Sequence, residues 1–371
     1  MLDQALDREI SAKLSHLHEV LQRTGAAAFR LRGTDWFSWA TAGADPTVLL
    51  TAETGPAEVL ITADTAWVLT DEIEAPRLQA EELVGGRDQF FQLYRHPWSE
   101  GFRREAFVRD VTAGGKVLSD RPTAEEAKLP DSLIRKKRIL SASECDRYRQ
   151  IGRLASAAMT EVMQQAQPDW TEYQLAGAGA AALWKRGLQP ALTLVAGAER
   201  LPLYRHPTPT SAPLGQVAMM VFCARGYGLY ANLTRFVCFG PLSSQQQQLH
   251  QQIREIEAAA LDQCQMDVPL QQIFSRLKQG YEQQGYPTAI HEHHQGGTTG
   301  YLAREIVATP ETTATLQPGM AIAWNPSLRG AKIEDTFLIL ENGQLENLTL
   351  DPDWPSVTVH DRPRPLPLEI V

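Results

Sequence analysis

Hydrophobic residues recur at steps of three and four positions along the start of the chain, from Leu6 through Ile10, Leu14 and Leu17 to Leu21. This spacing predicts an amphipathic helix, and a glycine at position 25 is typical of the residue that ends one. Short apolar runs separated by turn residues follow, and they predict strands at 26–31, 47–51, 59–62 and 66–69. The alternation of helices and strands up to about residue 120 indicates a small α/β domain.

The second half of the chain repeats one order of elements. Ser141 to Glu144 and Thr171 to Gln174 both have the spacing of a capping box, and each precedes a predicted helix. The stretch 219–240, MMVFCARGYGLYANLTRFVCFG, then reads as two strand-like runs around a short glycine-containing turn, which predicts a β-hairpin. Two more striped helices follow, near 249–260 and 273–281. The order of two helices followed by strands thus occurs twice between residues 141 and 340.

Composition narrows the class of protein. A chain of 371 residues with 43% hydrophobic side chains predicts two domains with large cores. The net charge of -9 and a pI near 5.6 argue against a nucleic-acid partner. Four cysteines without metal-type spacing favour a reducing compartment. The charged N-terminus and the lack of a run of about 20 apolar residues indicate neither a signal peptide nor a membrane span. We therefore expect a soluble, cytoplasmic protein.

Several short motifs carry a family resemblance. The hairpin contains Thr234-Arg235, and His294-Gln-Gly-Gly, Leu316-Gln-Pro-Gly-Met and Lys332-Ile-Glu-Asp-Thr follow it. Together they resemble the pita-bread family of creatinase, aminopeptidase P, prolidase and methionine aminopeptidase. The resemblance implies an α/β (α+β) fold, with a small creatinase-like N-terminal α/β domain at 1–130 and a pita-bread catalytic domain at 131–371. It also implies a homodimer.

The family holds two divalent metals with two Asp, one His and two Glu. By the resemblance, those five positions carry Val221, Asn232, His294, Asn325 and Glu334 here. One carboxylate cannot offset the charge of two buried dications, and amides are weak substitutes. The sequence therefore predicts no metal and no cofactor. The alternative is a single Zn or Mn bound through His294 and Glu334, helped by the nearby His291 and His293, which we expect on one face of a strand.

Acid–base chemistry is the remaining route to catalysis. His206 precedes the hairpin where the family places a substrate-contacting histidine, and the resemblance to metal-free creatinase implies that it acts as general acid or base. His294 would stabilise developing charge, and Glu334 would orient a water or hold a cationic group. The expected substrate-binding residues are Asn232, Asn325, Tyr301 and Arg304.

Two further side-chain groups have open interpretations. Cys223 shares a strand face with position 221, so it is either a nucleophile or a buried structural thiol. The segment Asp35-Trp36-Phe37 either caps a partner's pocket or belongs to the core of the first domain. Arg235 is expected to be a structural ion-pair partner.

The function hypotheses follow from this site. The first is a metal-independent hydrolase of a small C–N substrate, such as an amide, amidino compound or dipeptide, using His206. The alternative is a non-catalytic pseudo-peptidase that binds a ligand. The second alternative is an Xaa-Pro aminopeptidase or dipeptidase with an unusual ligand set. In each case we expect a small-molecule or short-peptide ligand; its identity, and whether turnover occurs, do not follow from the sequence.

Overall fold

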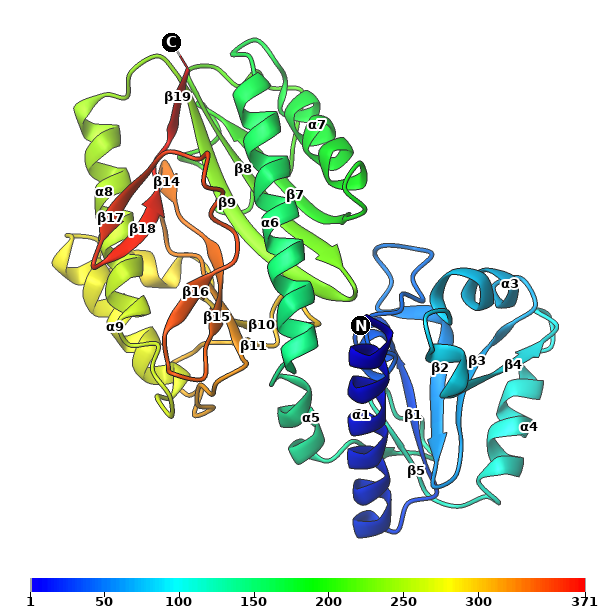
Figure 1. Ribbon diagram of the computed structural model, residues 1–371. Coiled ribbons are helices and arrows are strands. Elements are labelled where there is room, and N and C mark those ends of the chain that lie inside the picture. Colours follow the sequence, from blue (N-terminus) through cyan, green and yellow to red (C-terminus); the bar gives the residue numbers. More distant parts are fainter. Residues whose placement is uncertain (1, 371) are drawn as a thin grey trace. The chain divides into compact units, whose positions relative to one another are not determined.

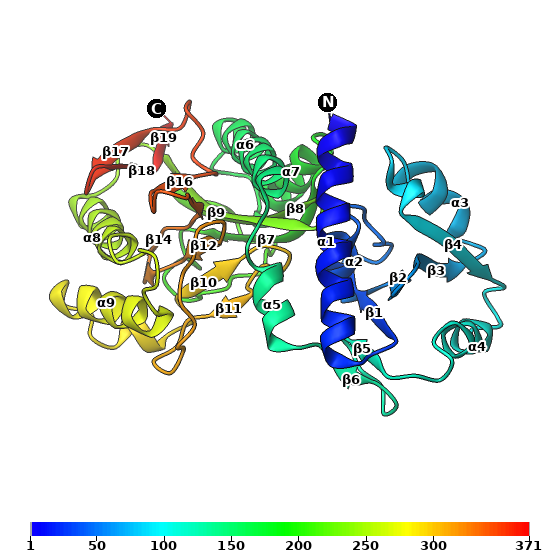
Figure 2. The ribbon, with the colours of Figure 1, turned by 60° about the horizontal axis from the view of Figure 1, so that its bottom comes forward.

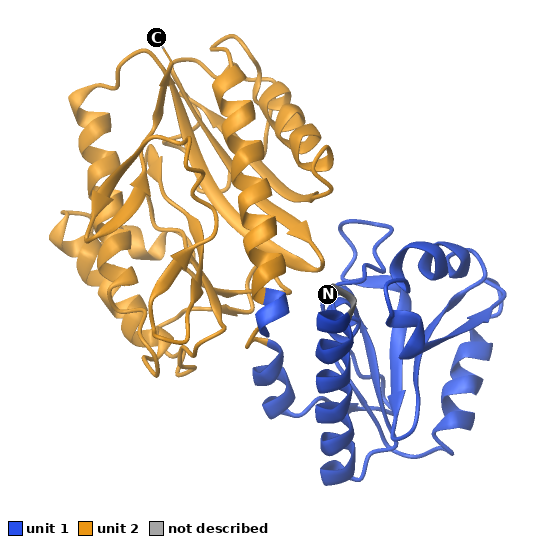
Figure 3. Cartoon of the chain, viewed as in Figure 1, with its two compact units in different colours: residues 1–137, 141–144 blue, residues 138–140, 145–371 orange. Residues whose placement is uncertain are grey.

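The computed structural model describes residues 2–370, and its contacts divide the chain into two compact units (Figures 1 and 3). The first unit comprises the residues up to 137 together with 141–144, and the second comprises 138–140 and 145–371. None of the helices in residues 2–370 is long and apolar enough to cross a membrane.

The first unit is a six-stranded mixed sheet with helices, in the strand order β4-β3-β2-β1-β5-β6. Its helices are α1 (Leu2–Thr24), α2 (Thr34–Ala40), α3 (Ala75–Arg77), η1 (Leu78–Glu82), η2 (Arg87–Gln89), α4 (Phe102–Val111) and α5 (Asp131–Lys137). Its strands are β1 (Ala28–Gly33), β2 (Thr54–Thr62), β3 (Ala66–Asp71), β4 (Phe91–His96), β5 (Val117–Ser119) and β6 (Ala127–Lys128).

The hydrophobic pattern places most of these elements correctly. Ile10, Leu17 and Leu21 of α1 are buried, and Gly25 ends the helix with φ of 62°. The strand predicted at 47–51 is wrong: this segment is a turn and bend, and Val48, Leu49 and Leu50 are exposed. The run was apolar, but it has no neighbouring strand with which to pair. Trp36 and Phe37 of α2 are buried, which favours the core interpretation for this segment.

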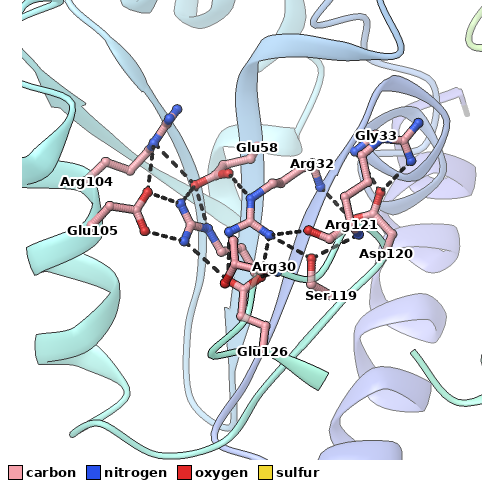
Figure 4. A network of polar contacts seen from close by, with 11 residues as sticks. Arg30, Arg32, Gly33, Glu58, Arg104, Glu105, Ser119, Asp120, Arg121 and Glu126 are labelled. Carbon is pink, nitrogen blue, oxygen red and sulfur yellow. Dashed lines mark hydrogen bonds and ion pairs between the residues drawn. The ribbon is translucent and has the colours of Figure 1, made fainter. Parts of the chain in front are cut away.

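A network of alternating charges crosses the sheet of the first unit (Figure 4). At its centre Arg30, whose side chain is 3% exposed, forms ion pairs with Glu58, Glu105 and Glu126. Arg32 on the same strand pairs with Glu58 and Glu126. Burial alone would lower the pKa of Arg30, but the bound carboxylates of Glu105 and Glu58 raise it above its ordinary value. Every cation of this network therefore has a partner.

The second unit contains two larger sheets, the two-stranded sheets β13-β14 and β17-β18, and helices that cover the larger sheets (Figures 1 and 2). Its helices are α6 (Ala142–Gln165), whose first three residues belong to the first unit, α7 (Glu172–Trp184), α8 (Ser244–Leu261), α9 (Leu270–Gln283) and η3 (Ala289–His291). Its strands are β7 (Gln189–Gly197), β8 (Val217–Gly226), β9 (Leu229–Phe239), β10 (Gly296–Thr299), β11 (Ile306–Val307), β12 (Ala321–Trp324), β13 (Ser327–Leu328), β14 (Ala331–Lys332), β15 (Asp335–Ile339), β16 (Leu345–Asn347), β17 (Ser356–Val359), β18 (Arg362–Pro365) and β19 (Leu368–Ile370).

Two sheets of this unit meet at the predicted hairpin. One sheet has the order β19-β9-β8-β7 and the other β11-β10-β12-β15-β16. A bridge between Thr234 of β9 and Glu334, just before β15, joins them. The hairpin prediction is confirmed: β8 and β9 pair antiparallel around Tyr227 and Gly228, which both have positive φ (49° and 78°) as a type I′ turn requires.

Helices cover both sheets in the predicted order. The Ser141–Glu144 and Thr171–Gln174 capping boxes are formed, each with both of its backbone hydrogen bonds. Gly179 lets α7 approach the sheet closely, because a Cβ there would lie 2.8 Å from a ring carbon of Phe222. Side chains of α8 and α9 pack with those of β12 and β15 in one hydrophobic cluster, with Trp324 fully buried at its centre. The mixed α/β fold predicted from the sequence is confirmed.

Candidate functional site

A pocket of about 380 Å³ opens beside the hairpin. Val221 and Cys223 reach it from alternate positions of β8, because side chains two residues apart share one face of a strand. Its lining residues come from seven segments of the second unit: Leu192, Leu194, His206, Thr208, Val221, Cys223, His294, Ala303, Arg304, Asn325, Lys332 and Glu334. The volume suits a small organic molecule or a short peptide.

Glu334 anchors the charges of this pocket. Its buried carboxylate pairs with the guanidinium of Arg304, lies 3.6 Å from the ammonium of Lys332 and accepts a hydrogen bond of 3.1 Å from Thr234. Burial by itself would raise the pKa of Glu334, but the charges of Lys332 and Arg304 hold it below its ordinary value. Glu334 is therefore ionised, and two cations share its single negative charge.

Three imidazoles form a triangle at the same place. The ring centroid of His206 lies 5.5 Å from that of His293 and 5.6 Å from that of His294, and the last two are also 5.6 Å apart. Burial, strengthened by the charge of Lys332, lowers the pKa of His206, and burial lowers that of His293 to about 3. Burial and the charge of Arg304 lower the pKa of His294 to about 4. All three rings are therefore neutral at pH 7.

Hydrogen bonds fix the roles of two of these rings. The backbone N–H of Gly296 donates to Nδ1 of His294 at 3.3 Å, so the neutral ring carries its proton on Nε2 and can donate there. His293 is held by Ser327 and Gln295 through its two ring nitrogens, at 3.1 and 3.4 Å. His206 makes no hydrogen bond to any residue of 2–370, so both its ring nitrogens remain available for a ligand.

Two asparagines, Asn325 in the pocket lining and Asn232 outside it, each bury an amide oxygen without a partner among residues 2–370. Asn232 is fully buried and donates through Nδ2 to Thr299 at 3.0 Å, while its Oδ1 accepts no hydrogen bond from residues 2–370. The same holds for Oδ1 of Asn325, which lines the pocket. An unpaired buried acceptor costs free energy, so a bound donor group would be stabilising at Asn325.

The remaining residues chosen from the sequence have different surroundings. Tyr301 is 1% exposed and is not among the residues that line this pocket. Burial raises the pKa of the Cys223 thiol to about 12, which disfavours a nucleophilic thiolate. Arg235 forms an ion pair with Asp335 at 2.7 Å, as the structural interpretation predicts. His291 ends a 3-10 helix, so the prediction that it shares a strand face with His293 is wrong.

Sequence reasoning missed the role of Lys332. Lys332 begins the motif Lys332-Ile-Glu-Asp-Thr, but a single lysine in that motif does not indicate a pocket cation. Its position two residues before Glu334 is the signal that could have been used, because residues at that spacing in an extended segment point the same way.

Comparison with known proteins places the chain among peptidases and their relatives. The model of metallopeptidase family M24 matches residues 146–341. The prolidase from Pyrococcus horikoshii OT3 superposes with a TM-score of 0.75 at 18% identity, over 92% of this chain and 98% of that one. The Xaa-Pro dipeptidase from Bacillus anthracis gives 0.75 at 16%, over 97% and 100%. No curated protein sequence matches the chain.

A structure with a different description shares the same fold. The N-terminal domain of FACT complex subunit SPT16 from chickpea, Cicer arietinum, superposes with a TM-score of 0.70 at 12% identity, over 92% of this chain and 96% of that one. At such identities these likenesses show the fold, and they confirm the pita-bread architecture expected from the motifs.

The family match corrects one prediction. We expected no cofactor, but the matched family is one of metallopeptidases, so that expectation is contradicted at the level of the family. The side chains of this pocket are a separate test. Within residues 2–370 no group of three or more His, Cys, Asp or Glu is placed to hold a metal. Glu334, the one carboxylate of the lining, is already bound by Arg304 and Lys332. These residues do not fit a pair of dications.

Proposed function

Because this chain belongs to metallopeptidase family M24, we propose that its second unit hydrolyses a C–N bond in a short peptide or similar small amide, with His206 as acid and base. The observation that carries the proposal is the position of His206: an unbonded imidazole on the pocket wall, beside two other neutral imidazoles. Burial lowers the pKa of His206 below its ordinary value, so the ring is a neutral base at pH 7 that can take a proton and return it.

The charge of the pocket selects the substrate class. Arg304 and Lys332 carry two positive charges against the one negative charge of Glu334, so the cluster keeps an excess of one positive charge. A substrate carboxylate would neutralise it through charge-assisted hydrogen bonds. Leu192, Leu194 and Val221 supply apolar wall on which a side chain of the substrate can pack. The preferred substrate is therefore a dipeptide-like acid with an apolar side chain.

The proposed reaction uses one water molecule. A nitrogen of His206 takes a proton from the water as its oxygen attacks the amide carbon, and the carbonyl oxygen becomes negative. Nε2–H of His294 donates to that oxygen, and the excess positive charge stabilises it. The C–N bond then breaks as the proton on His206 passes to the leaving nitrogen. The products are an acid and an amine, and His206 is neutral again.

The other proposed residues have supporting roles. Glu334 holds Arg304 and Lys332 at the pocket and is a positioning residue, since its carboxylate is occupied by these cations. Asn325 would accept a hydrogen bond from a substrate N–H through its unpaired Oδ1. Asn232 keeps Thr299 and the hairpin in place, since Nδ2 donates to that hydroxyl.

Binding without turnover is the second candidate. The occupied state of Glu334 favours it, because a carboxylate already paired with two cations is a poor activator of water. In that case the pocket would hold the same dipeptide-like acid as a ligand, and His206 would serve as a hydrogen-bonding group.

A substrate panel separates these possibilities. The purified chain is incubated with Xaa-Pro dipeptides, other dipeptides and N-acyl amides, with and without a chelator, and both amine release and thermal shift are measured. We expect turnover that falls by about 10²–10⁴-fold in His206→Gln, with the ligand-induced thermal shift retained. His291→Gln, an exposed imidazole outside the lining residues, is the matched control and should keep full activity.

Each other result has a defined meaning. Full turnover in His206→Gln would disprove the acid–base role. A thermal shift with no turnover in the wild type would establish the binding function instead. Turnover that disappears with the chelator and returns with added metal would make the protein a metallopeptidase with an unusual ligand set.

A further inference from the structure

A second cavity lies in the same unit, between α8 and the C-terminal segment. Its volume is about 560 Å³, and it is lined by Leu242, Gln247, His250, Gln251, Arg254, Pro355, Leu366, Pro367, Leu368 and Glu369. Four of these residues, at 247, 250, 251 and 254, recur with helical spacing and so form one face of α8. The opposite wall comes from Pro355, just before β17, and from residues 366–369, after β18; β17 and β18 run beside α8 in both views (Figures 1 and 2).

Arg254 is the unusual residue of this cavity. Arg254 is 8% exposed, and its side-chain atoms Nε and Nη1 are buried without a hydrogen-bond partner among residues 2–370. A guanidinium stays charged in proteins, and burying it without a counter-charge is costly. Burial lowers the pKa of Arg254, and the nearby charge of Glu255, which opposes this shift, does not cancel it; the charge of Arg364 lowers the pKa further.

The neighbouring ion network cannot supply the missing charge. Arg364 is bound by Glu257 at 2.6 Å and by Asp335 at 2.8 Å, and Asp335 also holds Arg235 at 2.7 Å. Two arginines there balance two carboxylates, so no negative charge is left over for Arg254.

Two acids near this cavity also form no ion pair with Arg254. Glu255, the next residue of α8, lies 3.2 Å from His360, and its charge acts on Arg254 without direct contact. Glu369 lines the cavity but is exposed to solvent, so water screens its charge, and it makes no ion pair within residues 2–370. The buried guanidinium of Arg254 therefore has no ion-pair partner among residues 2–370.

We propose that this cavity is a binding site for a small amphipathic carboxylate, whose carboxylate pairs with Arg254 and whose apolar body fills the space between α8 and the C-terminal segment. A carboxylate supplies the counter-charge that the buried Arg254 lacks, and it offers two oxygens to the two unpaired nitrogens. The walls supply the apolar contact through Leu242, Leu366 and Leu368. Two exposed glutamines, Gln247 and Gln251, lie at the solvent side. The site is separate from the pocket of His206 and shares no lining residue with it.

Octanoate is the probe, with octan-1-ol as its uncharged counterpart and inorganic phosphate as an anion without an apolar body. Binding to the full-length chain is measured by calorimetry. We expect octanoate to bind at least ten-fold more tightly than either of the other two. Arg254→Met should weaken octanoate at least ten-fold and leave octan-1-ol unchanged, because the apolar walls remain. Arg276→Met on α9, which is not among the lining residues, is the matched charge-removing control and should bind octanoate as the wild type does.

Folding is checked by thermal unfolding of each variant without ligand. Since Arg254→Met removes an unpaired buried charge, its melting temperature should equal or exceed that of the wild type. Equal binding of octanoate and octan-1-ol, unchanged octanoate binding in Arg254→Met, or phosphate binding as tight as that of octanoate would each overturn the proposal. These results do not depend on any turnover at His206.

Discussion

Two buried ion clusters of this protein use the same side chains in opposite ways. In the first unit, three arginines meet three carboxylates (Figure 4): Arg30, Arg32 and Arg104 against Glu58, Glu105 and Glu126. In the second unit, Arg304 and Lys332 meet Glu334 alone. The first cluster is balanced and joins β1 and β2 to α4 and to the residue before β6, whereas the second is unbalanced and lines a pocket.

The difference indicates how a structural cluster can be told from a ligand site. A buried ion pair contributes little net stability over an apolar pair, but removing one partner is strongly destabilising. A balanced network therefore needs nothing further to be stable. An excess cation has an unmet electrostatic requirement, which a bound anion can satisfy. By this criterion Arg304, Lys332 and Arg254 indicate ligands, and Arg30 does not.

The largest effect should come from breaking the balanced cluster. Arg30→Met would leave Glu58, Glu105 and Glu126 without their central cation, and we expect a loss of about 3–5 kcal/mol in unfolding free energy. Urea unfolding, with hydrogen exchange of β1 and β2 to localise the change to the first unit, measures it. Arg103→Met removes an arginine that is 55% exposed from its pair with Glu100, and it should change stability by less than about 0.5 kcal/mol. A loss below about 1 kcal/mol in Arg30→Met would mean that balance does not mark structural importance.

Lowering the pH should destabilise the second unit, because its buried histidines are held neutral. Burial lowers the pKa of His293 and of His250 to about 3, against 6.5 in the unfolded chain. Below pH 6.5 the unfolded state therefore binds more protons than the folded state, and stability falls until the pH reaches about 3. By pH 5 each ring should cost roughly 1–2 kcal/mol relative to pH 7.

A variant isolates this contribution. His293→Asn should reduce the slope of stability against pH between 6.5 and 5, as measured by urea unfolding at a series of pH values. An unchanged slope would show that the ring of His293 is not held neutral by its surroundings.

Local sequence patterns predicted much of the fold but only part of the candidate site. Hydrophobic spacing and capping residues located α1, α6 and the hairpin, because each depends on residues close in sequence. The same reasoning placed a strand at 47–51, where the apolar residues have no neighbouring strand. Whether a short apolar run becomes a strand depends on a partner that the run itself does not specify.

The charge balance of the two pockets could not be predicted from the sequence, because it also depends on residues that are distant in the chain. Motifs selected His206, His294, Asn325 and Glu334, which all line one pocket. Nothing in the local sequence of Arg254 distinguishes it from a solvated helical arginine. Its significance appears only when the pairing of Arg364 with Glu257 and Asp335 is known, since these residues lie far apart in the chain.

The smallest effect should come from removing the excess charge itself. Lys332→Met would leave Arg304 and Glu334 as a balanced pair, so we expect a change in unfolding free energy of less than about 1 kcal/mol. Because Lys332 is one of the causes that lower the pKa of His206, that pKa should rise toward 6.5 in the variant. A general base works in its deprotonated form, so the acid limb of the pH–rate profile should move to higher pH. NMR titration of His206 measures the shift even without a substrate, and Lys278→Met on α9, half exposed, is the control that should leave it unchanged. A stability loss as large as that of Arg30→Met, with no movement of the His206 titration, would show that Lys332 is part of a structural network and that the excess charge does not mark a ligand site.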